Sequence, residues 1–252
     1  MSYEVPDLAE VVAAQPRPLV FVAVSGAHLY GFPSRDSDVD LRGAHVLPAD
    51  EVLGLDPGPE TLGRMWTREG VELDLVTHDV LKFCKLLLRP NGDVLEQVTS
   101  PLVLRTTEAH RRLRELVSSC VTTHHAHHYQ GFARNQWRLF ERTDELKPLL
   151  YTFRVLLTGI HLMRTGEVQA NLPALLATHE APAYLADLVE AKVAAEHGRL
   201  PATPARSRLR ADVVKWQAIL DEARCASRLP TAPTARAALN TLLLDLRRSP
   251  PR

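Results

Sequence analysis

The stretch 18-PLVFVAVSGAHLYGFPSRDSDVDLRG-43 changes abruptly from apolar to acidic residues. Its first seven residues are apolar and rich in β-branched side chains, which predicts a buried strand. A piece with two glycines follows at 25–31, and Asp36, Asp38 and Asp40 come soon after it. Carboxylates crowded together resist joint ionisation unless a positive charge lies beside them. A cation is therefore expected close to this segment.

Asp38 and Asp40 are the acidic residues of a predicted strand over 38–47. Residues i and i+2 of a strand share a face, so these two side chains project together while Val39 and Leu41 point to the core. Mg²⁺ prefers carboxylate oxygens and keeps coordination positions open for phosphates and water. The pair is therefore predicted to bind a divalent metal ion beside a polyphosphate. An ordinary Ser/Asp-rich turn between strands is the alternative explanation.

A third carboxylate usually completes a two-metal site, and the predicted strand 71–78 offers Glu72 and Asp74 on one face. The residues by themselves leave the choice between these two open. The turn at 25–31 is expected to present backbone N–H groups, which bind anions at glycine-rich turns and helix N-termini. A metal-bound polyphosphate would contact both the turn and the carboxylates.

The chain changes character along its length. Short β-branched runs at 18–24, 38–47 and 71–78 predict three strands of one sheet. The spacing of apolar residues then predicts a helix over 79–90. Further helices are expected at 107–121, 144–166, 182–197 and 208–226. The sequence thus predicts an α+β protein with a sheet-containing domain over 1–106 and an all-helical domain over 107–252.

Composition argues against several classes of protein. Thirty basic residues balance thirty acidic ones, so a general polyanion binder is not expected. Cys84, Cys120 and Cys225 form no CxxC pair, which argues against a disulfide framework and against a thiolate zinc site. No apolar run is long enough to span a membrane and no signal peptide is visible, so a cytoplasmic protein is expected. No sequence feature specifies an oligomeric state.

The order of these motifs resembles the nucleotidyltransferases of the DNA polymerase beta superfamily. Their signature is a Gly-Ser turn after the first strand, then a DxD strand, then a lone carboxylate on a later strand. Three segments, taken in order, resemble more closely the RlaP-like group, which is associated with RNA-repair pathways. These segments are 29-LYGFPSRDSDVDLRG-43, 78-HDVLKFCKLLLRPNGDVLEQVTSP-101 and 147-KPLLYTFRVLLTG-159.

The resemblance implies a role for each candidate residue. A small mixed-sheet catalytic domain of the polymerase beta type would precede a helical substrate-binding domain. Asp38, Asp40 and Asp74 would bind two Mg²⁺ or Mn²⁺ ions, with Asp74 selected over Glu72 by its distance from the following helix. A nucleoside triphosphate such as ATP would contact residues of the turn and of the helix around 147–159. These are Ser25, Gly26, Ala27, His28, Tyr30, Gly31, Lys147, Tyr151 and Arg154.

Lys147, Tyr151 and Arg154 are spaced i, i+4, i+7 and therefore share one face of a helix. The resemblance implies that this face meets the nucleotide, with the base stacked on Tyr151 and the cations on phosphates. Packing of Tyr151 in a helical bundle and surface ion pairs of the two cations would explain the same residues.

The expected function is transfer of a nucleoside monophosphate to an acceptor hydroxyl, such as the end of a tRNA or of another repair substrate. One departure concerns this function: the chain reads Ser25-Gly26-Ala27, so the hydroxyl that usually follows the glycine is missing. This departure favours a second hypothesis, a catalytically silent nucleotide-sensing module. A third is adenylylation of a protein hydroxyl by an antitoxin-type enzyme, although those relatives tend to lack an extra helical half.

Other motifs give weaker signals. His124, His127 and His128 have spacings that can chelate Zn²⁺ on a helix, but no Glu of an HExxH motif or Cys accompanies them. A polar helix surface that contacts substrate phosphates through Arg134 and Arg138 is the alternative. The arginine-rich pieces 111–114 and 206–210 are short, and a solvated helix face is their default explanation.

Overall fold

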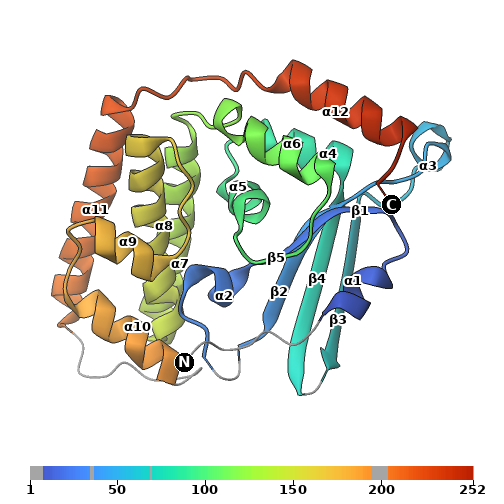
Figure 1. Cartoon of the computed structure of the whole chain (residues 1–252). Coiled ribbons are helices and arrows are strands. Elements are labelled where there is room, and N and C mark those ends of the chain that lie inside the picture. Colours follow the sequence, from blue (N-terminus) through green and yellow to red (C-terminus); the bar gives the residue numbers. More distant parts are fainter. Residues whose placement is uncertain (1–7, 35–36, 69, 195–203, 252) are drawn as a thin grey trace. The chain divides into compact units, whose positions relative to one another are not determined.

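The computed structural model describes residues 8–34, 37–68, 70–194 and 204–251 (Figure 1). The chain forms two compact units, and neither is continuous in sequence. The first unit contains Met1–Leu29, Asp38–Cys120 and Ala232–Arg252, and the second contains Tyr30–Ser37 and Val121–Thr231. The boundary predicted after residue 106 lies inside the first unit. The C-terminal segment from Ala232 also belongs to the unit that contains the sheet.

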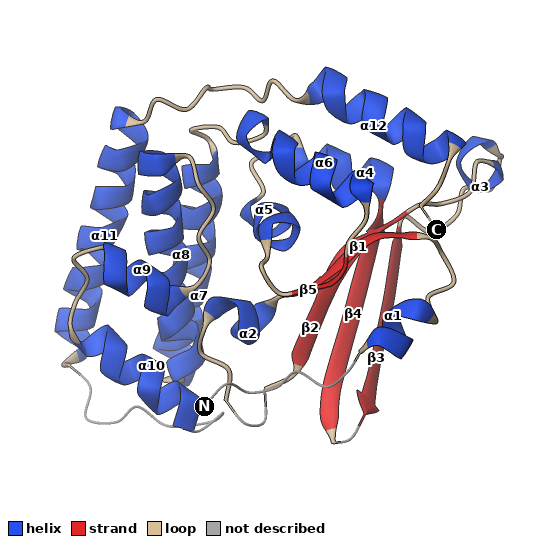
Figure 2. Ribbon diagram, in the orientation of Figure 1, coloured by secondary structure: helices blue, strands red, loops and turns tan. Residues whose placement is uncertain are grey.

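A five-stranded mixed sheet forms the centre of the first unit (Figure 2, red). Its strands lie in the order β3-β4-β2-β1-β5. Only the β2–β4 pair is parallel among the strand pairs described. The strands are β1 (Leu19–Val24), β2 (Val39–His45), β3 (Thr61–Arg68), β4 (Val71–Asp79) and β5 (Val103–Arg105). The three predicted strands are β1, β2 and β4, whereas the edge strands β3 and β5 were not predicted.

Helices cover both faces of this sheet. On one face Leu8 and Val12, beside and within α1, pack with inward residues of the strands such as Val39 and Leu41. On the other face Phe21 of β1 packs edge-on against Phe83 of α4 and stacks on His110 of α6. The helices of this unit are α1 (Ala9–Ala13), α2 (Gly26–Tyr30), α3 (Asp50–Leu53), α4 (Val80–Leu87), α5 (Gly92–Thr99), α6 (Glu108–Leu116) and α12 (Arg236–Arg248), with α2 ending on the first residue of the second unit.

The second unit is helical. Its central helix α8 (Leu146–Thr165) is buried over most of its surface, as its nearly continuous apolar sequence requires. The helices packed around it are α7 (His125–Thr143), α9 (Leu172–Thr178), α10 (Tyr184–Ala194) and α11 (Arg206–Ala226). The predicted helix over 182–197 corresponds to α10 as far as Ala194, and its last three residues lie outside the described ones.

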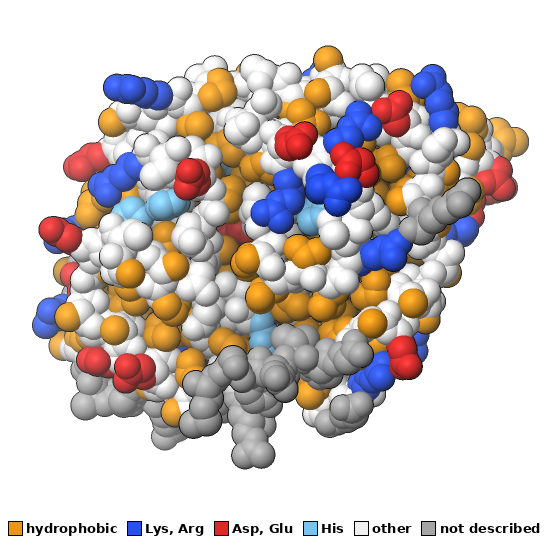
Figure 3. All heavy atoms as spheres, in the orientation of Figure 1, with side chains coloured by type: hydrophobic (Ala, Val, Ile, Leu, Met, Phe, Trp, Pro, Cys, Tyr) orange, Lys and Arg blue, Asp and Glu red, His pale blue; other side chains and the backbone are white. Residues whose placement is uncertain are grey.

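These elements confirm the predicted fold class, a mixed sheet followed by helices. No helix in the described ranges is both long and apolar enough to cross a bilayer. Basic and acidic side chains are interspersed over α6 and α12 (Figure 3). Arg111 pairs with Glu108 within α6, and Arg112 of α6 pairs with Asp245 of α12. The balance of charge seen in composition is therefore repeated on this part of the surface.

Candidate functional site

Asp40 and Asp74 lie directly opposite each other in the sheet. The parallel pairing of β2 with β4 places Asp40 against Asp74, and Val39 against Leu73. Val39 and Leu73 belong to the apolar cluster on the α1 face, so the alternation of a strand directs both carboxylates to the opposite face. Glu72 shares that face but lies two residues before Asp74. The register therefore brings Asp74, and not Glu72, opposite Asp40.

The two carboxylates converge on one nitrogen atom of Arg42. The Nη2 group of Arg42 donates to Asp40 Oδ1 at 2.6 Å and to Asp74 Oδ2 at 2.8 Å. About a quarter or less of each of these three side chains is exposed. Oxygens from two strands thus surround a point that already holds positive charge. This donor set fits a divalent metal ion, because hard carboxylate oxygens are the ligands that Mg²⁺ prefers.

Asp38 is the third predicted metal ligand, and it directly precedes β2. Within the described ranges, no three His, Cys, Asp or Glu side chains are grouped so as to hold a metal ion. The converging set therefore consists of the Asp40 and Asp74 carboxylates, and a ligand role for Asp38 stays a prediction. Sequence reasoning did not identify Arg42; its position two residues after Asp40, on the same strand face, was the available signal.

Gly26 lies against the Asp40 carboxylate. Its φ of +61° falls in the left-handed region, and a Cβ at this position would lie 2.0 Å from Asp40 Oδ2. The backbone N–H of Ser25 also donates to the Asp40 carbonyl oxygen at 2.8 Å. The turn after β1 is thus fixed to the DxD strand, and only glycine fits there.

Within the predicted turn over 25–31, the residues Gly26–Tyr30 form the short helix α2. Ser25, Ala27 and His28 are all buried. The chain enters the second unit at Tyr30, the last residue of α2. The predicted binding residues Ser25, Gly26, Ala27 and His28 are therefore in the first unit together with the carboxylates.

The remaining predicted binding residues belong to the second unit, and several of them form a cluster. The Arg154 guanidinium carbon lies 3.6 Å from the centre of the Tyr30 ring, and Tyr151 meets Tyr30 edge-on at 5.3 Å between ring centres. Arg154 is only 1% exposed, while Lys147 and Tyr151 are half-buried. The structure thus brings Tyr30, Tyr151 and Arg154 together, with the cation stacked on an aromatic ring.

The segment that joins α2 to β2 is held by the helical unit. A Cβ at Gly31, where φ is +85°, would lie 2.5 Å from Asn171 Nδ2 just before α9. The ammonium of Lys192, on α10, donates to Ser34 Oγ at 3.2 Å. Ser34 and Lys192 are both fully or nearly fully buried. Sequence reasoning did not find this anchor, because residues 34 and 192 share no local pattern.

Two histidines further along the same strands, His45 and His78, have lowered pKa values. Burial, followed by the positive charges of Lys82 and Arg42, lowers the pKa of His78, which lies on the same strand face as Asp74. Burial also lowers the pKa of His45, at the end of β2, to about 4. Arg42 places a positive charge beside both Asp40 and Asp74.

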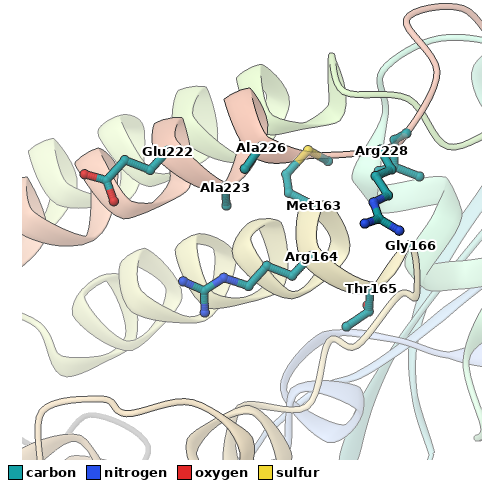
Figure 4. A pocket seen from close by; sticks show the side chains of 9 residues that line it. Met163, Arg164, Thr165, Gly166, Glu222, Ala223, Ala226 and Arg228 are labelled. Atoms are coloured by element: carbon teal, nitrogen blue, oxygen red, sulfur yellow. The ribbon is translucent and has the colours of Figure 1, made fainter.

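One cavity of about 570 Å³ lies wholly in the second unit (Figure 4). Met163, Arg164 and Thr165 line it from the end of α8, and Glu222, Ala223 and Ala226 line it from α11, as the figure shows. None of the predicted site residues borders this cavity. The carboxylates belong to the other unit, so the cavity and the candidate chemistry are separate features.

The histidine cluster lies at the start of α7. The rings of His124 and His127 are 6.0 Å apart, and His125 is buried with its Nδ1 beside Thr122. Burial lowers the pKa of His125 to about 4. His125 thus belongs to the protein interior, while His124 and His127 are exposed.

Two known proteins are similar to this chain in sequence. The chain is 32% identical over 158 residues to the uncharacterized protein MJ0002 of Methanocaldococcus jannaschii, covering 60% of this chain and 63% of that protein. The chain therefore spans less than two thirds of this relative. It is 24% identical over 187 residues to the uncharacterized protein YcgL of Bacillus subtilis, covering 69% of each.

A crystal structure of a nucleotidyltransferase-like protein from Exiguobacterium sibiricum aligns with 97% of this chain and 79% of its own. Its TM-score is 0.34 and its sequence identity is 14%. The family comparison is stronger, because residues 4–245 match RlaP, described as the RNA repair pathway DNA polymerase beta family. This match spans nearly the whole chain. The protein with Asp40 and Asp74 paired across its sheet therefore belongs to the RNA repair pathway DNA polymerase beta family.

Proposed function

We propose that this protein is a metal-dependent nucleotidyltransferase that transfers a nucleoside monophosphate from a nucleoside triphosphate to the hydroxyl of an RNA end, in the cytoplasm. The observation that carries the proposal is the register of β2 with β4, which sets Asp40 opposite Asp74. Family membership supports the reaction class. RNA as the acceptor rests on the family's description alone.

In the proposed reaction the acceptor oxygen forms a bond to the α-phosphorus, and the bond from the α-phosphorus to the bridging oxygen breaks. Pyrophosphate leaves with that oxygen, and the Asp74 carboxylate accepts the proton of the attacking hydroxyl. Two Mg²⁺ or Mn²⁺ ions, held by Asp38, Asp40 and Asp74, would supply charge neutralisation to the phosphates. The side chains contribute alignment, because phosphoryl transfer needs little covalent work from a protein.

Gly26 supports this assignment. Its backbone lies so close to Asp40 that no side chain fits between them, so a phosphate bound at this turn would lie beside the carboxylate. Ser25 and the N–H groups of Ala27 and His28 are proposed to take the place of the missing hydroxyl. Tyr30, Gly31, Lys147, Tyr151 and Arg154 stay candidates for nucleotide contacts in the second unit.

The test is transfer of label from each α-labelled nucleoside triphosphate, with Mg²⁺ or Mn²⁺, to RNA and protein fractions. The Asp40→Asn and Asp74→Asn variants are expected to lose at least a hundredfold in rate, because each removes a charged group from the reacting centre. Asp187→Asn, on α10 in the second unit, changes charge equally and is expected to retain full transfer.

The acceptor that carries the label decides between the hypotheses. Label on RNA that depends on Asp40 supports the proposal, and label on a protein would assign the adenylylating activity instead. Nucleotide binding without release of pyrophosphate would assign the silent sensing module. Wild-type turnover by Asp40→Asn would show that the carboxylate pair does not take part.

A further inference from the structure

Arg42 spans the two carboxylates that the proposed function uses. Besides donating to Asp40 Oδ1 and Asp74 Oδ2 through Nη2, it donates through Nη1 to the backbone carbonyls of Asp74 at 2.7 Å and Leu41 at 3.0 Å. Four acceptors on two neighbouring strands thus fix one guanidinium. All four belong to the first unit. The planar fork of arginine suits such multiple contacts, whereas lysine provides only a point charge.

A metal ion and the Arg42 guanidinium, which bridges Asp40 and Asp74, require the same lone pairs on the two carboxylates. Mg²⁺ binds carboxylate oxygens at about 2.0–2.1 Å, and the Arg42 nitrogen already lies 2.6 and 2.8 Å from the two oxygens that face each other. A dication placed between those oxygens would also lie against a guanidinium of the same sign, which is unfavourable. Occupation of this point by Arg42 and by a metal ion is therefore mutually exclusive.

We propose that Arg42 is a positioning residue that holds Asp40 and Asp74 in place in the metal-free protein and leaves them when a metal ion binds with a nucleotide. The inference rests on the proposed function. A metal ion that binds alone must break the hydrogen bonds from Arg42 to Asp40 and Asp74, and it provides no new acceptor for the guanidinium. Metal that arrives with a nucleoside triphosphate also brings phosphate oxygens, which accept strong hydrogen bonds from a released guanidinium. Arg42 thereby weakens metal binding in the absence of nucleotide.

Thermodynamic linkage gives the sign of the effect. An interaction present only in the metal-free state lowers metal affinity by its own coupling free energy, and a change that removes it raises that affinity. Removal of Arg42 also takes one positive charge away from the two facing carboxylates, which strengthens their attraction for a cation. Both effects act in the same direction when nucleotide is absent.

The experiment titrates the full-length protein with Mn²⁺ and measures free Mn²⁺ by electron paramagnetic resonance, with and without a non-hydrolysable nucleoside triphosphate analogue. Arg42→Gln is expected to bind Mn²⁺ at least tenfold more tightly than wild type without nucleotide, which corresponds to about 1.4 kcal/mol. The difference between the two proteins is expected to shrink with the analogue present. This readout does not depend on turnover.

Three further variants control the experiment. Arg64→Gln removes the same charge from β3, where the guanidinium lies over Trp66 instead of the carboxylates, and is expected to bind Mn²⁺ as wild type does. Arg42→Lys keeps the positive charge but lacks the planar fork of arginine, and it replaces Arg42→Gln in the experiment if that variant does not fold. Its Mn²⁺ affinity is expected to lie between those of wild type and Arg42→Gln. Asp40→Asn combined with Arg42→Gln is expected to lose the tight site.

The outcomes separate this inference from the proposed function. Equal or weaker Mn²⁺ binding by Arg42→Gln without nucleotide would overturn the inference, while Asp40-dependent label transfer could still hold. An equal gain in Mn²⁺ affinity with and without the analogue would overturn the proposal that Arg42 leaves the carboxylates when nucleotide binds with the metal ion. Absence of Mn²⁺ binding in both proteins would overturn the inference together with the metal site of the proposed function.

Discussion

At the scale of single residues, the candidate site depends on close approach between the turn after β1 and the DxD strand. Gly26 occupies a left-handed conformation and has the Asp40 carboxylate where a side chain would begin. The sequence identifies this glycine as important, since a glycine directly after a buried strand indicates a special backbone position. It does not reveal that the constraint comes from Asp40, fourteen residues later.

Gly26→Ala is expected to impair the protein in two ways. A left-handed conformation costs a non-glycine residue about 1–2 kcal/mol, and the added methyl group would push Asp40 away from Asp74. We expect a lower free energy of unfolding in urea and a loss of label transfer. Gly63→Ala on β3 is the matched control, because no atom lies within 4 Å of its added Cβ. Full transfer and unchanged stability in Gly26→Ala would contradict this account.

At the scale of elements, the ends of segments were the hardest to predict. Asn91 and Gly92 indicate the end of α4, yet the Asn91 side chain also accepts from the N–H groups of Asp93 and Val94 and so begins α5. Strand β3 is an edge strand with exposed Met65, which lacks the alternation of a half-buried strand. Strand β5 has only three residues. Short and edge elements carry too little periodicity to stand out in a sequence.

The C-terminal helix α12 is tied to the sheet by a buried ion pair. Arg247 donates to Asp79 Oδ1 at 2.8 Å and to Oδ2 at 2.5 Å. Asp79 also accepts from the N–H groups of Leu47 and Leu81, the latter in the first turn of α4. Burial alone would raise the pKa of Asp79, but these hydrogen bonds lower it overall. One carboxylate thus joins β4, α4 and α12.

Arg247→Met is expected to destabilise the protein by about 3–5 kcal/mol, because it leaves the Asp79 carboxylate buried without its partner. The loss should be present at neutral pH and shrink as the pH falls toward 4, because burial raises the pKa of the unpaired Asp79 carboxyl and the variant takes up a proton that the wild type does not. Urea unfolding at pH 7 and pH 4 measures both. Arg248→Met, one residue later and exposed, is expected to change stability by less than about 0.5 kcal/mol. Equal stability of the two variants would contradict this role for the ion pair.

At the scale of the whole molecule, the two units are assembled from segments far apart in sequence. The segment Tyr30–Ser37 belongs to the helical unit although it lies between α2 and β2, and Arg154, Asn171 and Lys192 all contact it. Each unit also contains a deeply buried histidine, His45 in the first and His125 in the second. Burial lowers the pKa of both to about 4.

These two histidines predict how stability depends on pH. Between their usual pKa of about 6.5 and about 4, the unfolded chain binds protons that the folded protein does not. The free energy of unfolding is therefore expected to fall as pH decreases through this window. Urea midpoints at pH 7.5, 6 and 5 measure the effect, and His45→Asn and His125→Asn should each reduce the slope. A midpoint that stays constant from pH 7.5 to 5 would show that these residues titrate normally.

The sequence by itself determined the three central strands, the helical character of the second half and the family motif around Asp38 and Asp40. These features depend on local periodicity and on residue types close together in the chain, which act before any tertiary contact forms. Only the tertiary structure decided that Asp74 faces Asp40, that Arg42 bridges them and that Ala232–Arg252 returns to the sheet. Strand register and buried ion pairs join residues tens to hundreds of positions apart, and each is selected by the packing of the whole unit, which no local pattern records.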